Sequence, residues 1–281
     1  MWIGIGNTIL RCGGGVIVDP DLATYMTGLS TPLSTSQKTL LNSFYITTKS
    51  GLGLTNIYDY FDCMYIIGGE TKESSYRNLV KRAHDITVSI EPTWTALEGS
   101  RGNGTSQFLN LNYNPNTQGV NFTQNNAGYG IYSRTNGSIV GIDMGAANAT
   151  VTNAAYIHLK QAAVFYGILN NYAASNVNDL DVTIPDTFGM YMITRNGPAI
   201  TNLVAYKNKT IHTYRTGTDV TSSPPNFNVY VCAANVDGAA SNFCTRQYSL
   251  VFWSKYITEA NRDVIVDAFE TYMDANGKGV I

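Results

Sequence analysis

The chain has 281 residues and 44% of them are hydrophobic, which is enough to bury a sizeable core in one large domain or two small ones. Only 14% are charged and the net charge at pH 7 is -2, with no cluster of lysine and arginine of the kind that nucleic-acid-binding proteins carry. No run approaches the roughly 18 apolar residues that span a membrane. The composition therefore argues against nucleic-acid partners and against membrane insertion.

Two helices are predicted near the beginning of the chain. Residues 21–29 place apolar side chains at helical spacing, on Leu22, Tyr25, Met26 and Leu29. Ser34 can cap a second helix over residues 36–51, which Gly51 would end. The apolar stripe of this second helix consists of Leu40, Leu41, Phe44 and Tyr45.

Strand patterns lie on either side of these helices. The opening stretch, MWIGIGNTILRCGGGVIV, is apolar but lacks a basic start and carries Arg11, so it is more typical of a buried or partner-covered strand than of a signal peptide. Residues 63–67 form a second apolar strand pattern, which two glycines end. We therefore predict an N-terminal segment of helices and strands over residues 1–84 that packs on the remainder or anchors it.

From residue 85 onward, short segments with alternating side chains are separated by Gly, Asn, Asp and Pro. These segments are residues 86–90, 93–97, 106–112, 128–135, 138–145, 155–160, 163–169, 188–195, 202–208, 210–216, 226–235 and 245–253. Strands at this spacing indicate an antiparallel sandwich. Thr258 can cap a closing helix over residues 258–275. We predict a mainly β fold, with an antiparallel jelly-roll sandwich over residues 85–281, short N-terminal helices and one C-terminal helix.

The stretch that begins at Arg101, RGNGTSQFLNLNYNPNTQGVNFTQNNAGYGIYSRTNGS, is dense in glycine and asparagine. A phosphate-binding loop needs such glycines directly before a helix, where backbone N–H groups meet the anion. Here a strand pattern, SQFLNLNY, follows instead. We interpret the glycines and asparagines as turn residues, because both tolerate a positive φ.

Residues suited to metal binding are scarce. No histidine stands at zinc-ligand spacing and no two cysteines form a CxxC pair. The residues concerned are His84, His158, His212, Cys12, Cys63, Cys232 and Cys244. Free buried thiols are expected, with a disulfide between Cys232 and Cys244 as the alternative. Asp143, or the pair Asp179 and Asp181, could offer oxygens to calcium, although aspartates in turns more often cap local N–H groups. We predict no metal and no cofactor.

Catalytic motifs are also missing from the sequence. There is no G-x-S-x-G elbow and no H-E-x-x-H helix. Glycoside hydrolysis usually needs two carboxylates that face one sugar, and Asp143 has no strand partner of this kind. We therefore predict no catalytic residues and no enzymatic activity.

Side chains that suit sugars lie in the glycine- and asparagine-rich loops. Aromatic rings stack on pyranose faces, and asparagine amides both donate and accept hydrogen bonds. The candidate glycan contacts are Tyr113, Asn114, Asn116, Asn125 and Asn126. The alternative interpretation is that loops of this composition turn well and stay soluble without charge.

Four stretches resemble a family of tailed-bacteriophage virion proteins that carry a concanavalin A-like, or laminin-G-like, jelly-roll domain. They are DPDLATYMTGLSTPLSTSQKTLLNSFYITTKSGLGLTNIYDYFDCMYIIGG, GSRGNGTSQFLNLNYNPNT, NFTQNNAGYGIYSRTN and PNFNVYVCAANVDGAASNFCTRQYSLVFWSKYITEANRDVIVDAFETYMDANG. The GNGTS segment is the most distinctive of them. The resemblance covers most of the chain, with a looser match over residues 146–200.

The resemblance implies a structural component of the virion, assembled in the host cytoplasm, such as a head fibre, a decoration protein or a tail appendage. Its partners would be other virion proteins and further copies of the chain, with a trimer as the form common among virion appendages. A glycan of the host surface would be its ligand if it contributes to attachment. The alternative is a lectin-like adhesin or receptor-binding protein, and a polysaccharide depolymerase is the third, less favoured hypothesis.

Overall fold

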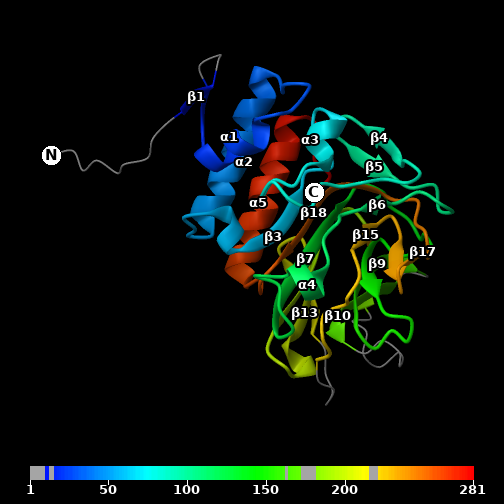
Figure 1. Cartoon of the computed structure of the whole chain (residues 1–281). Helices are drawn as coiled ribbons and strands as arrows, with labels where there is room; N and C mark the ends of the chain where they lie inside the picture. Colours follow the sequence, from blue (N-terminus) through cyan, green and yellow to red (C-terminus); the bar gives the residue numbers. More distant parts are fainter. Residues whose placement is uncertain (1–9, 13–15, 162–163, 172–181, 215–220) are drawn as a thin grey trace.

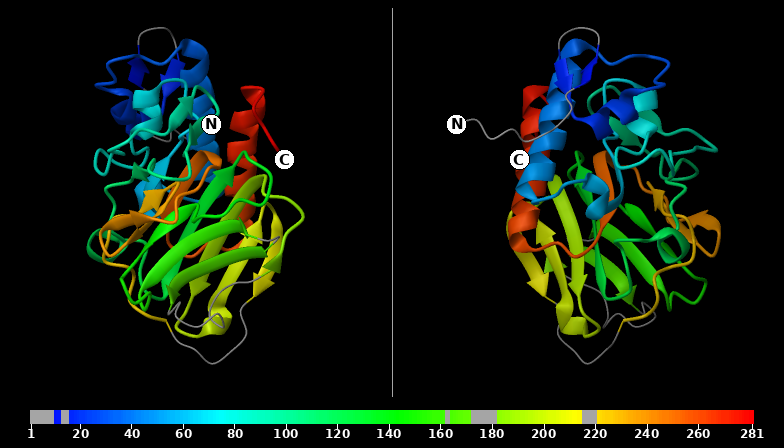
Figure 2. Two further views of the ribbon diagram at one scale, coloured as in Figure 1. Left: turned by 90° about the vertical axis from the view of Figure 1, so that its right-hand side faces the viewer. Right: turned by 60° about the vertical axis from the view of Figure 1, so that its left-hand side comes forward.

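The computed structural model describes residues 10–12, 16–161, 164–171, 182–214 and 221–281. In this part of the chain two β-sheets lie face to face, and a layer of helices covers the outer face of one sheet (Figure 1). Figure 2 shows the same layers from two further directions. The prediction of a mainly β sandwich with short N-terminal helices and one C-terminal helix is confirmed.

The sheet that the helices cover has the strand order β14-β13-β12-β7-β18-β5-β4, and β3 pairs with β18 beside β5. We call it the helix-covered sheet. Its strands are β3 (Phe61–Tyr65), β4 (Thr93–Thr95), β5 (Gly99–Arg101), β7 (Asn126–Ser133), β12 (Gly189–Asn196), β13 (Leu203–Lys207), β14 (Thr210–Tyr214) and β18 (Gln247–Ser254).

The second sheet has the order β11-β10-β9-β8-β15-β6, with β16 paired to β8 and β17 paired to β16. Its strands are β6 (Leu109–Asn110), β8 (Met144–Ala147), β9 (Ala154–Gln161), β10 (Val164–Asn171), β11 (Val182–Thr183), β15 (Tyr230–Val231), β16 (Ala234–Val236) and β17 (Ala239–Ser241). Among the described strands, β8 and β16 are the one parallel pair.

The central strands of the helix-covered sheet are apolar on both faces because both faces are buried. In β18, Val251 and Trp253 point into the space between the sheets, whereas Leu250 and Phe252 point toward the helices. Trp253 is the centre of the inner core. Its ring stacks on Tyr129 at 4.8 Å and contacts Phe122 at 4.7 Å. Such aromatic pairs add about 0.5–1.5 kcal/mol to the stability that burial provides.

The helical layer consists mainly of α1 (Pro20–Met26), α2 (Thr35–Gly51) and α5 (Glu259–Ala275). Ser34 caps α2 by accepting the N–H of Gln37, and Thr258 caps α5 in the same way. The two long helices pack on each other through Phe44 of α2, whose ring lies 5.9 Å from that of Phe269 of α5. Shorter helices are η1 (Ile57–Asp59), α3 (Lys72–Tyr76), α4 (Pro115–Gln118) and η2 (Ile200–Asn202). None of the helices in the described part is long and apolar enough to cross a bilayer.

The first helix ends three residues earlier than the predicted range of 21–29. Its last carbonyls are taken by the guanidinium of Arg77, which donates to the carbonyls of Tyr25 at 3.0 Å and Thr27 at 3.1 Å. A helix leaves its final carbonyls without partners inside the helix, so a side chain from a distant segment fixes the end. The neighbouring Gly28 then turns the chain with a φ of 77°.

The N-terminal segment, residues 1–84, supplies both helices and a strand. Its strand β3 pairs with β18, and Phe61 of β3 contacts Phe252 with ring centroids 5.5 Å apart. Of the predicted opening strand, the structure describes a short hairpin of β1 (Leu10–Cys12) and β2 (Val16–Val18). The hydrophobic cluster of the helical layer thus draws on residues from both sides of residue 84. The division of the chain at that residue stays a prediction.

Several predicted strands are shorter than expected, missing or divided; the predicted strand over residues 138–145, for example, contains only the first two residues of β8. Residues 106–112 contain only the two-residue strand β6, because the side chain of Asn103 accepts the N–H groups of Thr105, Ser106 and Gln107 and holds this segment in a turn. Residues 86–90 form a single bridge, between Thr87 and Asn110. The predicted strand over residues 226–235 is divided into β15 and β16 by Cys232, whose φ is 69°.

Candidate functional site

A buried carboxylate positions the loop that contains most of the predicted glycan contacts. Asp62 of β3 is 2% exposed, and its oxygens accept the backbone N–H groups of Val120 (3.1 Å), Asn121 (2.9 Å) and Phe122 (3.0 Å). The hydroxyl of Tyr113 also donates to Asp62, at 2.9 Å. Asp62 therefore holds both ends of the 113–122 loop against the sheet.

Tyr113 is fully buried, so the prediction that its ring stacks on a sugar is corrected. Its ring lies in the inner core, 5.9 Å from the ring of Trp253, and its hydroxyl is held by Asp62. No face of the ring is open to a ligand. The loop pattern did not reveal this burial, because the partner carboxylate comes from a strand 51 residues away.

The four predicted asparagines stay predictions as glycan contacts, although Asn116 lies in α4 and Asn126 is the first residue of β7. Asn114 caps α4 and donates to Asn226 at 3.1 Å, and Asn116 donates to the carbonyl of Pro224 at 3.1 Å. Asn125 accepts the hydroxyl of Thr221 at 2.8 Å. The structure therefore gathers these three along residues 221–226, whereas Asn126 accepts the N–H of Tyr256 at 2.8 Å. Each amide already has one internal partner.

Asp143, considered above as a calcium ligand, is a fully buried structural residue. Its carboxylate accepts the N–H of Leu159 at 2.6 Å and the hydroxyl of Tyr248, and lies 3.7 Å from Nε of Arg246. Asp179 and Asp181 lie outside the described residues. Within the described ranges, no three His, Cys, Asp or Glu side chains come close enough to hold a metal ion.

The described cysteines, Cys63, Cys232 and Cys244, are free and buried. Burial raises the pKa of the Cys244 thiol to about 12, and it raises the pKa of Cys63 and Cys232 well above the usual range. Thiols with raised pKa values stay protonated at neutral pH, so they are poor nucleophiles and poor metal ligands.

An open pocket of about 200 Å³ lies between α1 and the turn at residues 78–82. We call it the α1 pocket. Its polar lining includes Asp21 and Thr24 of α1, Tyr58 of η1, and the cationic side chains of Lys81 and Arg82. Tyr58 is 47% exposed, which is unusual in a chain that buries most of its tyrosines.

The far wall of the α1 pocket is held by one buried amide. Asn78 is 1% exposed, and its side-chain oxygen accepts the N–H groups of Met64 and Val80, each at 3.1 Å. Its amide nitrogen donates to the carbonyl of Ala83 at 2.9 Å. These bonds fix the turn that carries the two cationic side chains to the end of β3.

The α1 pocket is connected to the loop of predicted glycan contacts. The carbonyl of Tyr58 accepts the side-chain amide of Asn121 at 2.8 Å, and the backbone N–H of Asn121 is held by Asp62. The sequence pattern predicted glycan contacts in this loop, but it did not predict the pocket beside the loop. Its lining comes from three segments far apart in the sequence, and none of them shows a motif.

Charge in the α1 pocket is unevenly distributed. Asp21 lies 3.9 Å from Lys49, so one wall has a partly compensated carboxylate. On the other wall, Lys81 and Arg82 have no carboxylate oxygen within 4.0 Å among the described residues. Arg82 contacts only the carbonyls of Tyr25 and Thr27 there, both at 3.4 Å. The pocket therefore presents two uncompensated positive charges.

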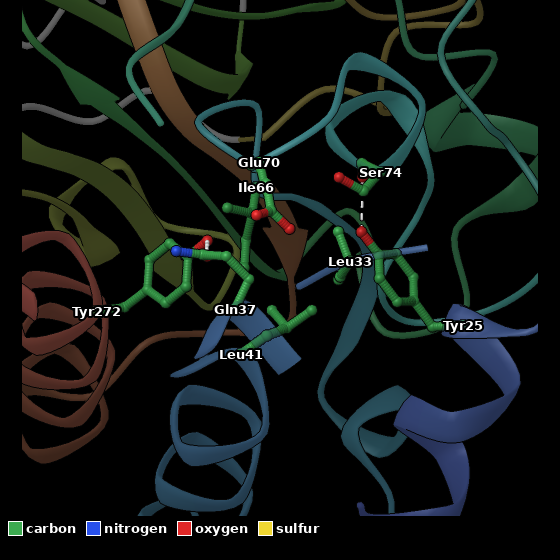
Figure 3. A pocket seen from close by; sticks show the side chains of 9 residues that line it. Tyr25, Leu33, Gln37, Leu41, Ile66, Glu70, Ser74 and Tyr272 are labelled. Carbon is green, nitrogen blue, oxygen red and sulfur yellow. Dashed lines mark hydrogen bonds between the residues drawn. The ribbon is translucent and has the colours of Figure 1, made fainter. Parts of the chain in front are cut away.

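A second cavity, behind α1, is too small for a ligand. It has a volume of about 10 Å³, close to the smallest space that holds a water molecule. Figure 3 shows its lining, in which Gln37 accepts the hydroxyl of Tyr272 at 3.1 Å and Tyr25 donates to the carbonyl of Ser74 at 2.6 Å. These bonds link α1, α2, α3 and α5, so this cavity belongs to the packing of the helical layer.

An aromatic surface on the second sheet is the other place where rings gather. Phe108 and Tyr230 stack with centroids 4.4 Å apart, and Phe243 lies 6.3 Å from Phe108. All three rings are partly exposed. Exposed aromatic rings can stack on sugars, so this surface is an alternative candidate to the α1 pocket.

His84 follows the turn that lines the α1 pocket, and its lowered pKa makes the stability of the fold depend on pH. Partial burial, and then the charge of Lys81, lower the pKa of His84 below its ordinary value of 6.5. Between that lowered value and about 6.5 the unfolded chain binds more protons than the folded chain, so stability falls as the pH drops below 6.5. We expect His84→Gln to reduce the loss of unfolding free energy between pH 7.5 and pH 5.5, measured by urea titration. An unchanged loss would contradict this assignment.

No protein-family model matches the chain, and no curated protein matches it. Solved structures with a similar fold include one described as a receptor binding domain (10% identity, TM-score 0.50, 74% of this chain and 51% of that chain). Another is a mutant of Trypanosoma rangeli sialidase displaying trans-sialidase activity (11% identity, TM-score 0.49, 88% of this chain and 40% of that chain).

A third similar structure is domain 4 of AbnA, a GH43 extracellular arabinanase from Geobacillus stearothermophilus, in complex with arabinotriose (10% identity, TM-score 0.39, 73% of this chain and 98% of that chain). The chain spans about half the length of the first of the three structures and less than half of the second. At identities this low the likeness concerns the β-sandwich fold alone. The bacteriophage setting rests on the resemblance of the sequence.

The prediction that the chain is not an enzyme was wrong. The solved structures that resemble the chain in part include sialidases, one from Trypanosoma rangeli and NanB from Streptococcus pneumoniae, of which the chain covers 40% and 23%. The absence of a catalytic motif in the sequence therefore carries no conclusion about activity.

Proposed function

We propose that the chain is a carbohydrate-binding β-sandwich of a bacteriophage particle, which attaches to glycans on the host surface through the α1 pocket. The sequence resemblance supports the virion setting. The observation that supports sugar binding is the α1 pocket itself, which is open, is lined by a half-exposed tyrosine ring and lies beside the asparagine-rich loop.

The α1 pocket offers the groups that a sugar ring requires. The ring of Tyr58 provides a face for the C–H groups of a pyranose. Asp21 accepts hydrogen bonds from hydroxyl groups, Thr24 both donates and accepts, and the two cationic side chains donate. Its volume of about 200 Å³ is far above the roughly 10–15 Å³ that a single water molecule needs, so it has room for a small ligand.

The first test is binding to a glycan array, with affinities for the best glycan measured by calorimetry. We expect Tyr58→Ala to weaken binding about tenfold, because losing one stacked ring costs about 1.4 kcal/mol. Tyr230→Ala, which removes a partly exposed ring from the second sheet, is the matched control and should leave affinity unchanged. If Tyr230→Ala weakens binding and Tyr58→Ala does not, the sugar binds the aromatic surface instead, and the proposed site is wrong.

The second test concerns the particle. An antibody against the purified chain is expected to label bacteriophage particles, and sedimentation of the purified chain is expected to show a homo-oligomer, with a trimer as the proposed form. Particles that carry none of the chain would contradict the virion role. Sugar binding would then be supported only by the glycan-array result.

A further inference from the structure

We propose that the α1 pocket selects an acidic sugar, whose carboxylate lies against Lys81 and Arg82. This inference rests on the proposed function, because it names the class of sugar that the same pocket takes. It is carried by the charges of the pocket wall rather than by its shape.

The fold makes little use of the two cationic side chains, since among the described residues Arg82 makes two long hydrogen bonds, both to backbone carbonyls. About half of the described cationic residues have a carboxylate partner, as Lys49 has with Asp19 at 2.8 Å and Lys207 with Asp186 at 2.6 Å. Lys81 and Arg82 have none within 4.0 Å among the described residues. In a chain with only 14% charged residues, two adjacent unpaired cations on one pocket wall are a distinctive arrangement.

Arg82 has N–H groups that make no hydrogen bond within the described residues. Only one of its terminal nitrogens makes hydrogen bonds within the described residues, and both of those bonds are long, at 3.4 Å. A guanidinium has five N–H groups in a planar fork that matches a carboxylate. Lys81 is partly buried in the same wall and adds a point charge. A carboxylate at this position would bind through charge-assisted hydrogen bonds, which are roughly twice as strong as neutral ones.

The opposite wall suits the rest of such a sugar. Asp21 is an acceptor that repels a second carboxylate but accepts hydroxyl protons, and Thr24 lies beside it on α1. The remaining titratable groups at the pocket are Tyr25, whose pKa burial raises so that it stays neutral, and Tyr58. The pocket therefore carries charges of both signs, positive on Lys81 and Arg82 of the 78–82 turn and negative on Asp21 of α1. An acidic sugar offers a carboxylate to the cations and hydroxyl groups to the aspartate.

The test compares matched saccharides by calorimetry: trigalacturonic acid against galactotriose, and sialyllactose against lactose. We expect the wild-type chain to bind the acidic member of at least one pair about tenfold more tightly, and we expect this preference to shrink between 50 and 500 mM salt. The double variant Lys81→Gln, Arg82→Gln should lose the preference and keep its affinity for the neutral member.

The matched control is the double variant Lys38→Gln, Arg101→Gln, which removes the same charge at positions outside the α1 pocket and should keep the preference. Thermal unfolding of both double variants confirms that they fold. Equal affinity for the acidic and neutral members, or a preference that survives in Lys81→Gln, Arg82→Gln, would overturn the inference and leave the proposed sugar binding intact. A chain that binds no saccharide on the array or in solution would overturn both.

Discussion

Asp62→Ala is expected to lower the free energy of unfolding by about 4 kcal/mol, because each buried donor left without an acceptor costs about 1–3 kcal/mol. The carboxylate accepts three backbone N–H groups of the 113–122 loop and the hydroxyl of Tyr113, and it is almost fully buried. Alanine can accept none of these bonds. The loop would have to move away from the sheet to recover them from water.

Urea unfolding, followed by tryptophan fluorescence, measures this effect, since Trp253, one of three tryptophans, lies in contact with Phe122 at the end of the loop. Asp59→Ala is the matched control. Asp59 is exposed and its side chain has one described hydrogen bond, to Asn56 at 3.3 Å, so the change should stay within about 0.5 kcal/mol. A variant at residue 62 that unfolds at the urea concentration of the wild type would show that the loop does not depend on this carboxylate.

Asp143→Ala is expected to cost about 3–5 kcal/mol, the range for removing one partner of a buried ion pair. The side chains of Asp143 and Arg246 are both 0% exposed and lie 3.7 Å apart. Without the carboxylate, the buried guanidinium loses its negative neighbour, and Leu159 loses the acceptor of its N–H. For a chain of this size, such a loss lowers Tm by about 10 °C.

Differential scanning calorimetry checks this result. Asp267→Ala removes an exposed carboxylate that pairs with Lys209 at 2.5 Å, with both side chains about half exposed. Its effect should be small, because surface ion pairs contribute about 0–1 kcal/mol. Added calcium should not raise the Tm of the wild type, since the oxygens of Asp143 are already engaged. A Tm that rises with calcium would mean that this carboxylate, or another, ligates the ion.

Elements with local signals could be predicted from the sequence. The two long helices follow from the caps Ser34 and Thr258 and from apolar side chains at helical spacing, all within one segment. The long strands β7, β9, β10, β12 and β18 were predicted to within a few residues because each is an eight-residue run with several β-branched or aromatic side chains. Two- and three-residue strands such as β6 and β16 are too short for a pattern to appear.

The candidate site could not be predicted because its groups come together only in the folded chain. Tyr58 and Arg82 reach the α1 pocket from different segments, and neither lies in a repeat or motif. In the sequence, nothing distinguishes Asp62 from the other residues of an apolar strand, although its carboxylate holds the 113–122 loop. Tyr113 was misassigned for the same reason, because its sequence neighbours are turn residues while its ring lies against Trp253.

The two ends of the described chain meet in one layer, which has a consequence for synthesis. Phe44 of α2 packs on Phe269 and Tyr272 of α5, and β3 pairs with β18. These contacts can form only after residues some 190 to 230 positions later in the chain have been translated. Contacts over such separations slow folding. A nascent chain would therefore expose the apolar faces of α1 and α2 until its last helix leaves the ribosome, and this interval is when it is most prone to aggregate or to need a chaperone.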